Sequence, residues 1–156
     1  MSYLKICILC LFFGASVWSQ EKAIVLNQIL FSESEQSWST RDMNLFEKVM
    51  LILNKKNISP WSEGRNEDFL LSRLSHREAL LFGVTPEKLK ISEADRKKLS
   101  EYSTKEVDAE LERISYVLMF VDLKENQLKQ KDRFVIWMNH LKRKYQAKIK
   151  YAEPAA

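Results

Sequence analysis

Ser72 and His76 are the two residues whose types and spacing could support nucleophilic catalysis. They lie four residues apart in a segment with helical periodicity, so their side chains can meet on one helix face. A hydroxyl nucleophile needs a base, and the base needs an orienting group, for which Glu78 is the nearby candidate. No nucleophile elbow or glycine-rich oxyanion loop accompanies them. We therefore predict no catalytic residue and interpret the chain as a non-enzyme.

The remaining metal-binding residue types give no basis for a cofactor. The second histidine, His140, is far from His76 in sequence, and neither has another ligand at helical spacing. His140 is better explained as a surface residue near a helix C-terminus. Both cysteines, Cys7 and Cys10, fall in the extreme N-terminal segment, where thiolate chemistry is not expected. The sequence predicts no metal and no cofactor.

The N-terminal segment has the pattern of a secretory signal peptide. One basic residue, Lys5, precedes an apolar run over 6–13, and Val17 and Ser19 supply small residues for cleavage. The apolar run is well short of the roughly 20 residues that a membrane-spanning helix requires. We predict a signal peptide over 1–19 and a periplasmic or secreted protein. The mature chain then has no cysteine, so no disulfide stabilises it.

Composition favours a single, mainly helical domain over residues 20–156. The 156-residue chain is 46% hydrophobic and 29% charged, which is typical of a globular protein and not of a disordered one. It contains only three glycines and three prolines, and both residues are common in the tight turns of β-proteins.

Hydrophobic periodicity predicts about five helices and a short two-stranded β ribbon. Ser39, Ser92 and Ser103 are each followed three residues later by an acidic side chain, which is the pattern of a capping box. A polar stretch at 32–37 is expected to be a loop. The expected helices cover 39–56, 66–82, short segments starting at Pro86 and Ser92, a segment starting at Ser103, and 126–145. The expected strands, 23–31 and 147–151, would pair with each other because an isolated strand cannot satisfy its backbone.

Tryptophans beside the first helix indicate a possible binding groove. Trp38 and Trp61 lie in polar segments on either side of it, and the helix itself carries Phe46, Met50 and Leu53. If these five residues line an open groove, they form an apolar surface suited to polypeptides, and methionine suits a promiscuous site. The alternative is that both tryptophans cap the edge of the core.

Basic residues concentrate near the C-terminus. Residues 124–151 carry nine lysines and arginines against two acidic residues. This surface could bind anionic lipid headgroups or acidic client segments, and an exported chain is not expected to meet nucleic acid. The alternative is that these cations complement a helix C-terminus and protect a strand edge. The predicted basic patch consists of Lys142, Arg143, Lys144, Lys148 and Lys150.

Four segments together resemble a known family. They are the opening strand 23–27, the stretch 38–42 at the first helix, the helix 69–82 followed by Gly83 and Val84, and the basic aromatic stretch 133–143. In this order they resemble the N-terminal chaperone domain of the SurA family of periplasmic peptidyl-prolyl isomerases and chaperones. The resemblance implies a helical envelope domain that cradles unfolded outer-membrane polypeptides. Members usually continue into parvulin domains, for which this chain has no room, so isomerase activity is not implied.

Two functional hypotheses follow. The first is a chaperone-like domain that binds unfolded or extended polypeptides through an apolar groove with a basic rim. The alternative is a non-catalytic envelope subunit that docks on one folded partner or on anionic lipid.

Overall fold

The computed structural model describes residues 29–33, 36–125 and 129–149, and it confirms the mainly helical fold with a small β ribbon. The predicted signal peptide over 1–19 lies outside these residues. Along the chain the elements are β1 (Ile29–Glu33), β2 (Gln36–Ser39), α2 (Thr40–Ile52), α3 (Arg65–Leu81), α4 (Glu93–Lys98), α5 (Thr104–Glu125), α6 (Lys131–Lys144) and β3 (Lys148–Ile149).

The β ribbon joins the two ends of the described fold, as predicted. Strand β1 pairs antiparallel with β3, where Phe31 faces Ile149 across the ladder. The ribbon also has a third strand, β2, so that the strand order is β2-β1-β3. Strands β1 and β2 extend into the polar segment 32–37 that was expected to be a loop. Pairing satisfies the backbone there without requiring apolar side chains. Residues 23–28 and 150–151 of the predicted strands lie outside the described residues.

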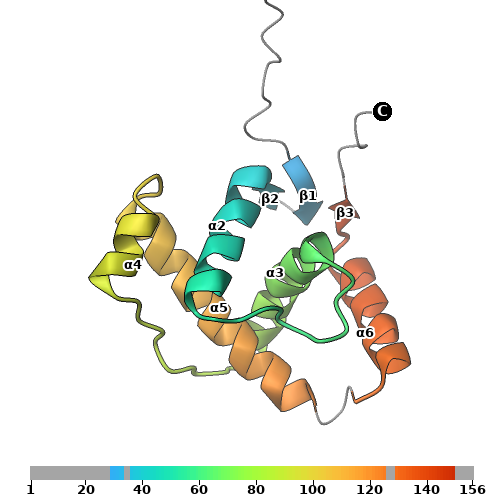
Figure 1. The fold of residues 1–156 in the computed structure, drawn as a ribbon. Coiled ribbons are helices and arrows are strands. Elements are labelled where there is room, and N and C mark those ends of the chain that lie inside the picture. The colour runs from blue at the N-terminus through green and yellow to red at the C-terminus, as the bar shows by residue number, and fades with distance from the viewer. Residues whose placement is uncertain (1–28, 34–35, 126–128, 150–156) are drawn as a thin grey trace, which may run out of the picture.

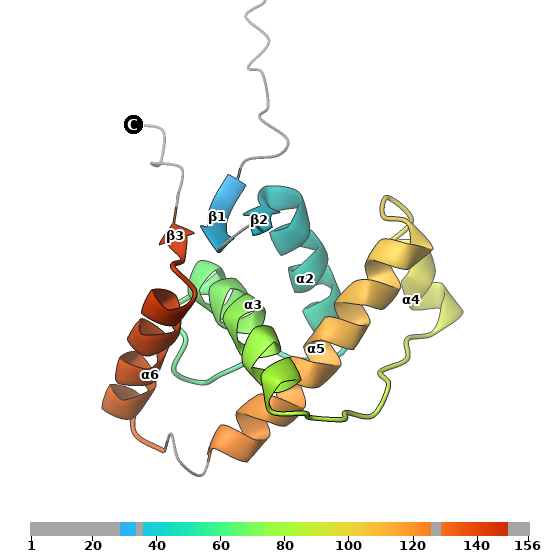
Figure 2. The ribbon, with the colours of Figure 1, turned by 180° about the vertical axis from the view of Figure 1, so that it is seen from behind.

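Helix α3 is the centre of the fold. Figures 1 and 2 show it between α6 on one side and α2 and α5 on the other. Its apolar residues over 69–79 are almost completely buried because the helix contacts all three neighbours, whereas Leu80 and Leu81 at its C-terminal end are exposed. The central core residues on α3 and α5 are Phe69, Leu70, Leu71, Leu74, Ile114 and Val117.

Local capping interactions set the helix starts. At α2 the Ser39 amide donates to the Asp42 carboxylate at 2.8 Å, and the Asp42 amide donates back to the Ser39 hydroxyl at 3.4 Å. At α5 the amide of Ser103 donates to the Glu106 carboxylate at 2.7 Å. The Glu106 amide donates back to the Ser103 hydroxyl at 3.2 Å. At α4 the Ser92 hydroxyl accepts from the Asp95 amide, without the reciprocal bond from the Ser92 amide. The predicted capping boxes at Ser39 and Ser103 are therefore confirmed, and Ser92 is an N-cap without the full box.

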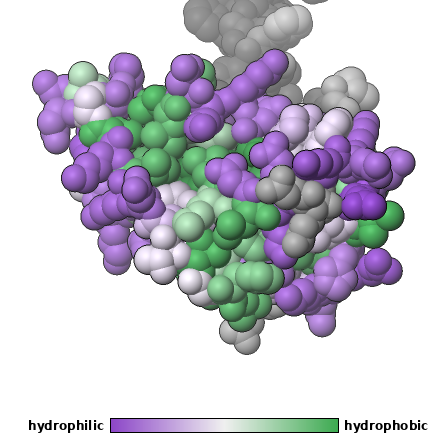
Figure 3. Space-filling view, turned by 90° about the horizontal axis from the view of Figure 1, so that it is seen from below, coloured by the Kyte–Doolittle hydropathy of each residue, from purple (hydrophilic) through white to green (hydrophobic). Residues whose placement is uncertain are grey.

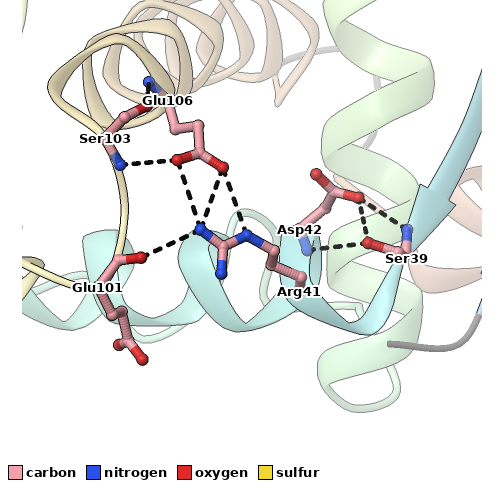
Figure 4. Close-up of polar contacts among 6 residues, drawn as sticks. All are labelled: Ser39, Arg41, Asp42, Glu101, Ser103 and Glu106. Carbon is pink, nitrogen blue, oxygen red and sulfur yellow. Dashed lines mark hydrogen bonds and ion pairs between the residues drawn. The ribbon is translucent and has the colours of Figure 1, made fainter. Parts of the chain in front are cut away.

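Arg41 connects the starts of α2 and α5. Figure 4 shows its guanidinium between the Glu106 carboxylate, at 3.3 Å, and the carbonyl oxygen of Glu101, at 3.1 Å. The side chains of Arg41 and Glu106 are both solvent-exposed, so we expect this pair to orient the helices more than it stabilises them.

Helix boundaries differ from the prediction at three places. The last helix, α6, begins at Lys131 and not at 126, because Gln130 before it has an extended backbone. Helix α2 ends at Ile52, short of residue 56, and Asn54 adopts a left-handed backbone with φ of 55°. Pro86 does not begin a helix, because residues 84–91 have no regular structure. Leu89 and Ile91 in this segment pack partly against the core. These side-chain contacts hold the segment in place although its backbone belongs to no helix or strand. Gly83, with φ of 68°, follows α3 as expected for a left-handed cap.

Candidate functional site

The structure does not bring the five predicted groove residues together. Phe46 and Met50 are only 2% and 3% exposed, because the helical repeat turns them toward the core with Val49. Leu53 is half-buried against the same core. Trp38 and Trp61 line separate hollows of the surface. Phe46 and Met50 do share one hollow along α2, of about 380 Å³, which neither tryptophan lines. The described residues therefore do not form a single groove that holds all five side chains.

Trp38 covers a buried ion pair. Arg73, on α3, and Glu110, on α5, form a two-pronged contact with nitrogen to oxygen distances of 2.9 and 3.0 Å, and both side chains are almost fully buried. The Trp38 ring lies 4.6 Å from the Arg73 guanidinium carbon and 5.0 Å from that of Arg113. Burial lowers the pKa of Arg73, and Glu110 opposes this shift. Trp38 thus packs at the edge of the core, in agreement with the alternative interpretation that the tryptophans cap the core.

Trp61 lines an apolar pocket of about 190 Å³. The pocket lies between the segment after α2, the second half of α5 and the first half of α6. Trp137 and Phe134 enter from α6, with ring centroids 6.3 Å apart. The remaining lining residues are Ile58, Ser59, Pro60, Leu71, Val121, Asp122 and Glu125. This pocket is the best candidate binding site in the described part of the chain.

A buried carboxylate holds the Trp61 segment in place. The Asp68 side chain accepts hydrogen bonds from the Ile58 amide at 2.9 Å, the Ser59 amide at 3.4 Å and the Ser62 hydroxyl at 2.9 Å. Burial raises the pKa of Asp68, and these donors oppose that shift. The Ser59 hydroxyl in turn accepts from the Trp61 amide. The pocket wall is therefore fixed to the first turn of α3.

Aromatic rings connect the pocket to exposed apolar surface. Trp137 lies 6.2 Å from Phe120, and Phe120 lies 5.6 Å from Phe82 at the end of α3. Phe82 is 62% exposed, although Phe120 is fully buried. We call the exposed apolar residues at the ends of α3 and α5 the apolar patch; they are Leu81, Phe82, Met119 and Leu123. Figure 3 shows hydrophobic side chains gathered in the middle of the lower face, with hydrophilic ones around its edges.

The rim of the pocket is acidic rather than basic. Asp122 and Glu125 line it, whereas Lys142, Arg143 and Lys144 lie at the opposite end of α6, next to Lys148 on β3. In Figure 1, α6 runs from the linker after α5 up to β3. The described members of the basic patch do lie at one end of the fold, and Lys150 is outside the described residues. The basic patch therefore does not form the rim of this pocket.

Part of the basic patch is engaged in intramolecular contacts. The Lys144 ammonium lies 2.5 Å from the Glu78 carboxylate, and the Tyr145 hydroxyl donates to the same oxygen. The Arg143 side chain donates to the Asn139 carbonyl oxygen at 3.3 Å. The Lys144 and Tyr145 contacts attach the end of α6 to α3. This agrees with the alternative explanation that these cations complement a helix C-terminus.

Ser72 and His76 do not form a catalytic pair. The Ser72 hydroxyl is fully buried and accepts from the Arg73 guanidinium at 3.3 Å. His76 packs edge-on against Tyr116, with ring centroids 5.7 Å apart. Burial, together with the nearby Arg113 and Arg73, lowers the pKa of His76 to about 4. A neutral imidazole packed in this way is a structural residue.

Replacing His76 with phenylalanine is expected to remove part of the acid sensitivity of the fold. The pKa of His76 is about 4 when folded and 6.5 in its unperturbed state, so the unfolded chain binds more protons between these values. The contribution of the neutral His76 to stability is complete above pH 6.5, and the free energy of unfolding decreases as the pH falls toward 4. Because the ring is partly exposed, we expect this histidine to account for a loss of about 1–2 kcal/mol in the free energy of unfolding. This is less than the roughly 3 kcal/mol that corresponds to the full pKa shift.

Urea unfolding at pH 7.5 and pH 4.5 measures this difference. The wild type should lose more stability than the His76→Phe variant over this interval, and His140→Phe, at an exposed position, should behave as the wild type. Equal losses in the wild type and His76→Phe would contradict the prediction.

Neither a metal site nor a membrane span is found in the described part of the chain. It contains no group of three histidine, cysteine or carboxylate side chains that could hold a metal ion. None of its helices is long and apolar enough to cross a bilayer.

No protein family, curated protein or solved structure matches this chain. The pocket must therefore be interpreted from its own geometry.

Proposed function

We propose that this protein is an exported, non-catalytic module that binds unfolded or extended polypeptides, and that the Trp61–Trp137 pocket receives an apolar side chain of the client. The observation that carries the proposal is a pocket walled by two half-buried tryptophans and connected by edge-on and tilted ring contacts to the exposed apolar patch. Exposed clusters of large apolar side chains commonly mark interaction sites.

The size of the pocket favours a side chain over a cofactor. Its volume of about 190 Å³ is close to the roughly 150 Å³ of an apolar cavity that accepts benzene. Pockets for drug-sized ligands are larger, typically about 300–1,000 Å³. One aromatic or branched side chain therefore fits the pocket, and the adjoining apolar patch can contact neighbouring residues of the same segment.

Docking on one folded partner or on anionic lipid is the alternative function. Lipid binding would use the basic patch, where Lys144 is already paired with Glu78. The polypeptide proposal uses an apolar surface that no described residue covers, so we prefer it. The resemblance of four sequence segments to SurA-type chaperone domains is part of this proposal and does not support it independently, since no family model matches the chain.

Export rests on the signal-peptide pattern of residues 1–19. Expression of the full chain in a bacterial host, followed by mass spectrometry of the envelope fraction, should give a mature protein that begins at Gln20. Retention of the intact chain in the cytosol would contradict export.

Light scattering of a denatured outer-membrane protein, diluted with and without the mature chain, tests polypeptide binding. We expect suppressed aggregation with the wild type. Truncation of one well-buried aromatic contact commonly costs a few kcal/mol, so Trp61→Ala should weaken client affinity about ten-fold or more. Leu51→Ala, which removes a 78% exposed side chain on α2 outside this pocket, should leave affinity unchanged.

Circular dichroism must show that both variants remain folded. Failure of the wild type to suppress aggregation of several clients would overturn the proposal and favour docking on a single folded partner.

A further inference from the structure

Two carboxylates share the wall of the apolar pocket. Asp122 and Glu125 are three residues apart on α5, so they lie on one face of the helix, and both line the pocket that contains Trp61 and Trp137. Neither forms an ion pair with any residue in the described part of the chain. The pocket thus combines an apolar interior with two negative charges at its edge.

Two lysines close to the carboxylates in sequence, Lys124 and Lys131, contact other groups. The Lys124 ammonium lies 4.3 Å from the centre of the Phe82 ring. Lys131, at the start of α6, lies 2.7 Å from the Glu63 carboxylate. Neither contact neutralises Asp122 or Glu125, so the two carboxylates are available to a cation from outside the molecule.

The basic patch does not reach the pocket wall. Lys142 and Lys144 follow the pocket residue Trp137 by about 8–11 Å along the axis of α6. Among the described residues that line the pocket there is no lysine or arginine. A bound peptide therefore meets two carboxylates and no cation in the pocket wall, on a chain whose net charge is +4.

Resting on the proposed function, we propose that this pocket selects polypeptide segments in which a large apolar residue has a lysine or arginine beside it. The apolar side chain enters between Trp61 and Trp137, and the neighbouring cation lies against Asp122 and Glu125. A segment with an acidic neighbour places like charges together and binds less tightly. Charge complementarity thus gives the site a preference that apolar contact alone does not provide.

Fluorescence anisotropy with three labelled peptides tests this preference. Each peptide has the same glycine-serine background and the same three phenylalanines, which are flanked by lysine, by serine or by glutamate. A lysine peptide without phenylalanine reports binding by charge alone. We expect the lysine-flanked peptide to bind roughly ten-fold more tightly than the glutamate-flanked one at low salt, and the difference to shrink at 0.5 M salt.

Charge-neutral variants identify the residues responsible. Asp122→Asn combined with Glu125→Gln should abolish the preference while phenylalanine-dependent binding persists. The matched control is Glu93→Gln combined with Glu112→Gln, which removes the same charge from exposed positions outside the pocket and should retain the preference.

Three results would overturn the inference. Equal affinity of the wild type for the lysine and glutamate peptides, or an unchanged preference in the pocket variant, would overturn the charge selection and leave polypeptide binding intact. Absence of binding by every peptide, together with no suppression of aggregation, would overturn the proposed function and this inference with it.

Discussion

Glu110→Gln is expected to lower the free energy of unfolding by about 3–5 kcal/mol, the largest effect of any single polar substitution in this fold. The carboxylate is the partner of Arg73, which is itself fully buried between α3 and α5. Glutamine keeps the size of the side chain but removes its charge. The guanidinium then remains in the core without a counter-ion, because an arginine side chain does not deprotonate in a protein.

Urea unfolding monitored by circular dichroism measures this loss. Glu106→Gln is the matched control, since it makes the same chemical change on the same helix at an exposed pair with Arg41. That variant should cost about 1 kcal/mol or less. Equal losses for the two variants would show that the Arg73–Glu110 pair does not carry the expected energy.

Replacing both partners separates the charge from the packing. The double substitution Arg73→Met and Glu110→Met removes the buried charges together and keeps apolar atoms against Trp38 and Phe69. We expect it to be considerably more stable than Glu110→Gln alone, because desolvation of a buried pair offsets much of its attraction. A double variant as unstable as the single one would show that the geometry of the pair matters more than its charge.

Local features of the fold were predictable because they depend on residues close in sequence. The caps at Ser39, Ser92 and Ser103 involve side chains three residues apart; the full capping box forms at Ser39 and Ser103, and Ser92 forms the N-cap bond alone. The pairing of the terminal segments was also predictable, since an isolated strand leaves its backbone groups unsatisfied.

Long-range features were missed because their partners are far apart along the chain. Arg73 lies four residues after Phe69 on the buried face of α3, but only the packing of α5 brings Glu110 to it. The pocket likewise joins Trp61 with Trp137 across three segments. Of the two tryptophans in the predicted groove, Trp61 lines this pocket, and Trp38 lines a different hollow.

The helical repeat of α2 explains why the predicted groove residues on this helix do not form an open groove. Phe46 and Met50 share one face of α2 with Val49, and that face is buried against α3 and α5. A helix carries one apolar face, and here the core requires it. The binding surface that we propose therefore lies elsewhere, around the pocket between the Trp61 segment, α5 and α6.

Asp68→Ala is expected to lower the free energy of unfolding by about 2–3 kcal/mol and to disrupt the pocket at the same time. The substitution removes the acceptor for the buried amides of Ile58 and Ser59 and for the hydroxyl of Ser62. Buried donors left without a partner lose their hydration and gain nothing in return. The segment that carries Trp61 should then detach from α3 while the helical core remains folded.

Hydrogen exchange followed by mass spectrometry distinguishes local release from general destabilisation. In Asp68→Ala, residues 57–63 should lose protection while the middle of α5 retains it. Client binding should weaken as it does in Trp61→Ala. Asp95→Ala on α4 is the control, because this carboxylate also accepts a serine hydroxyl but is not buried and lies outside the pocket.

If α5 lost protection in parallel with residues 57–63, the Asp68 contacts would stabilise the whole domain and not this wall alone. If residues 57–63 lost protection without any loss of client affinity, the pocket would not be the binding site, and polypeptide binding would have to be assigned to the apolar patch. The Asp68 variant therefore connects the stability of one loop to the function proposed for it.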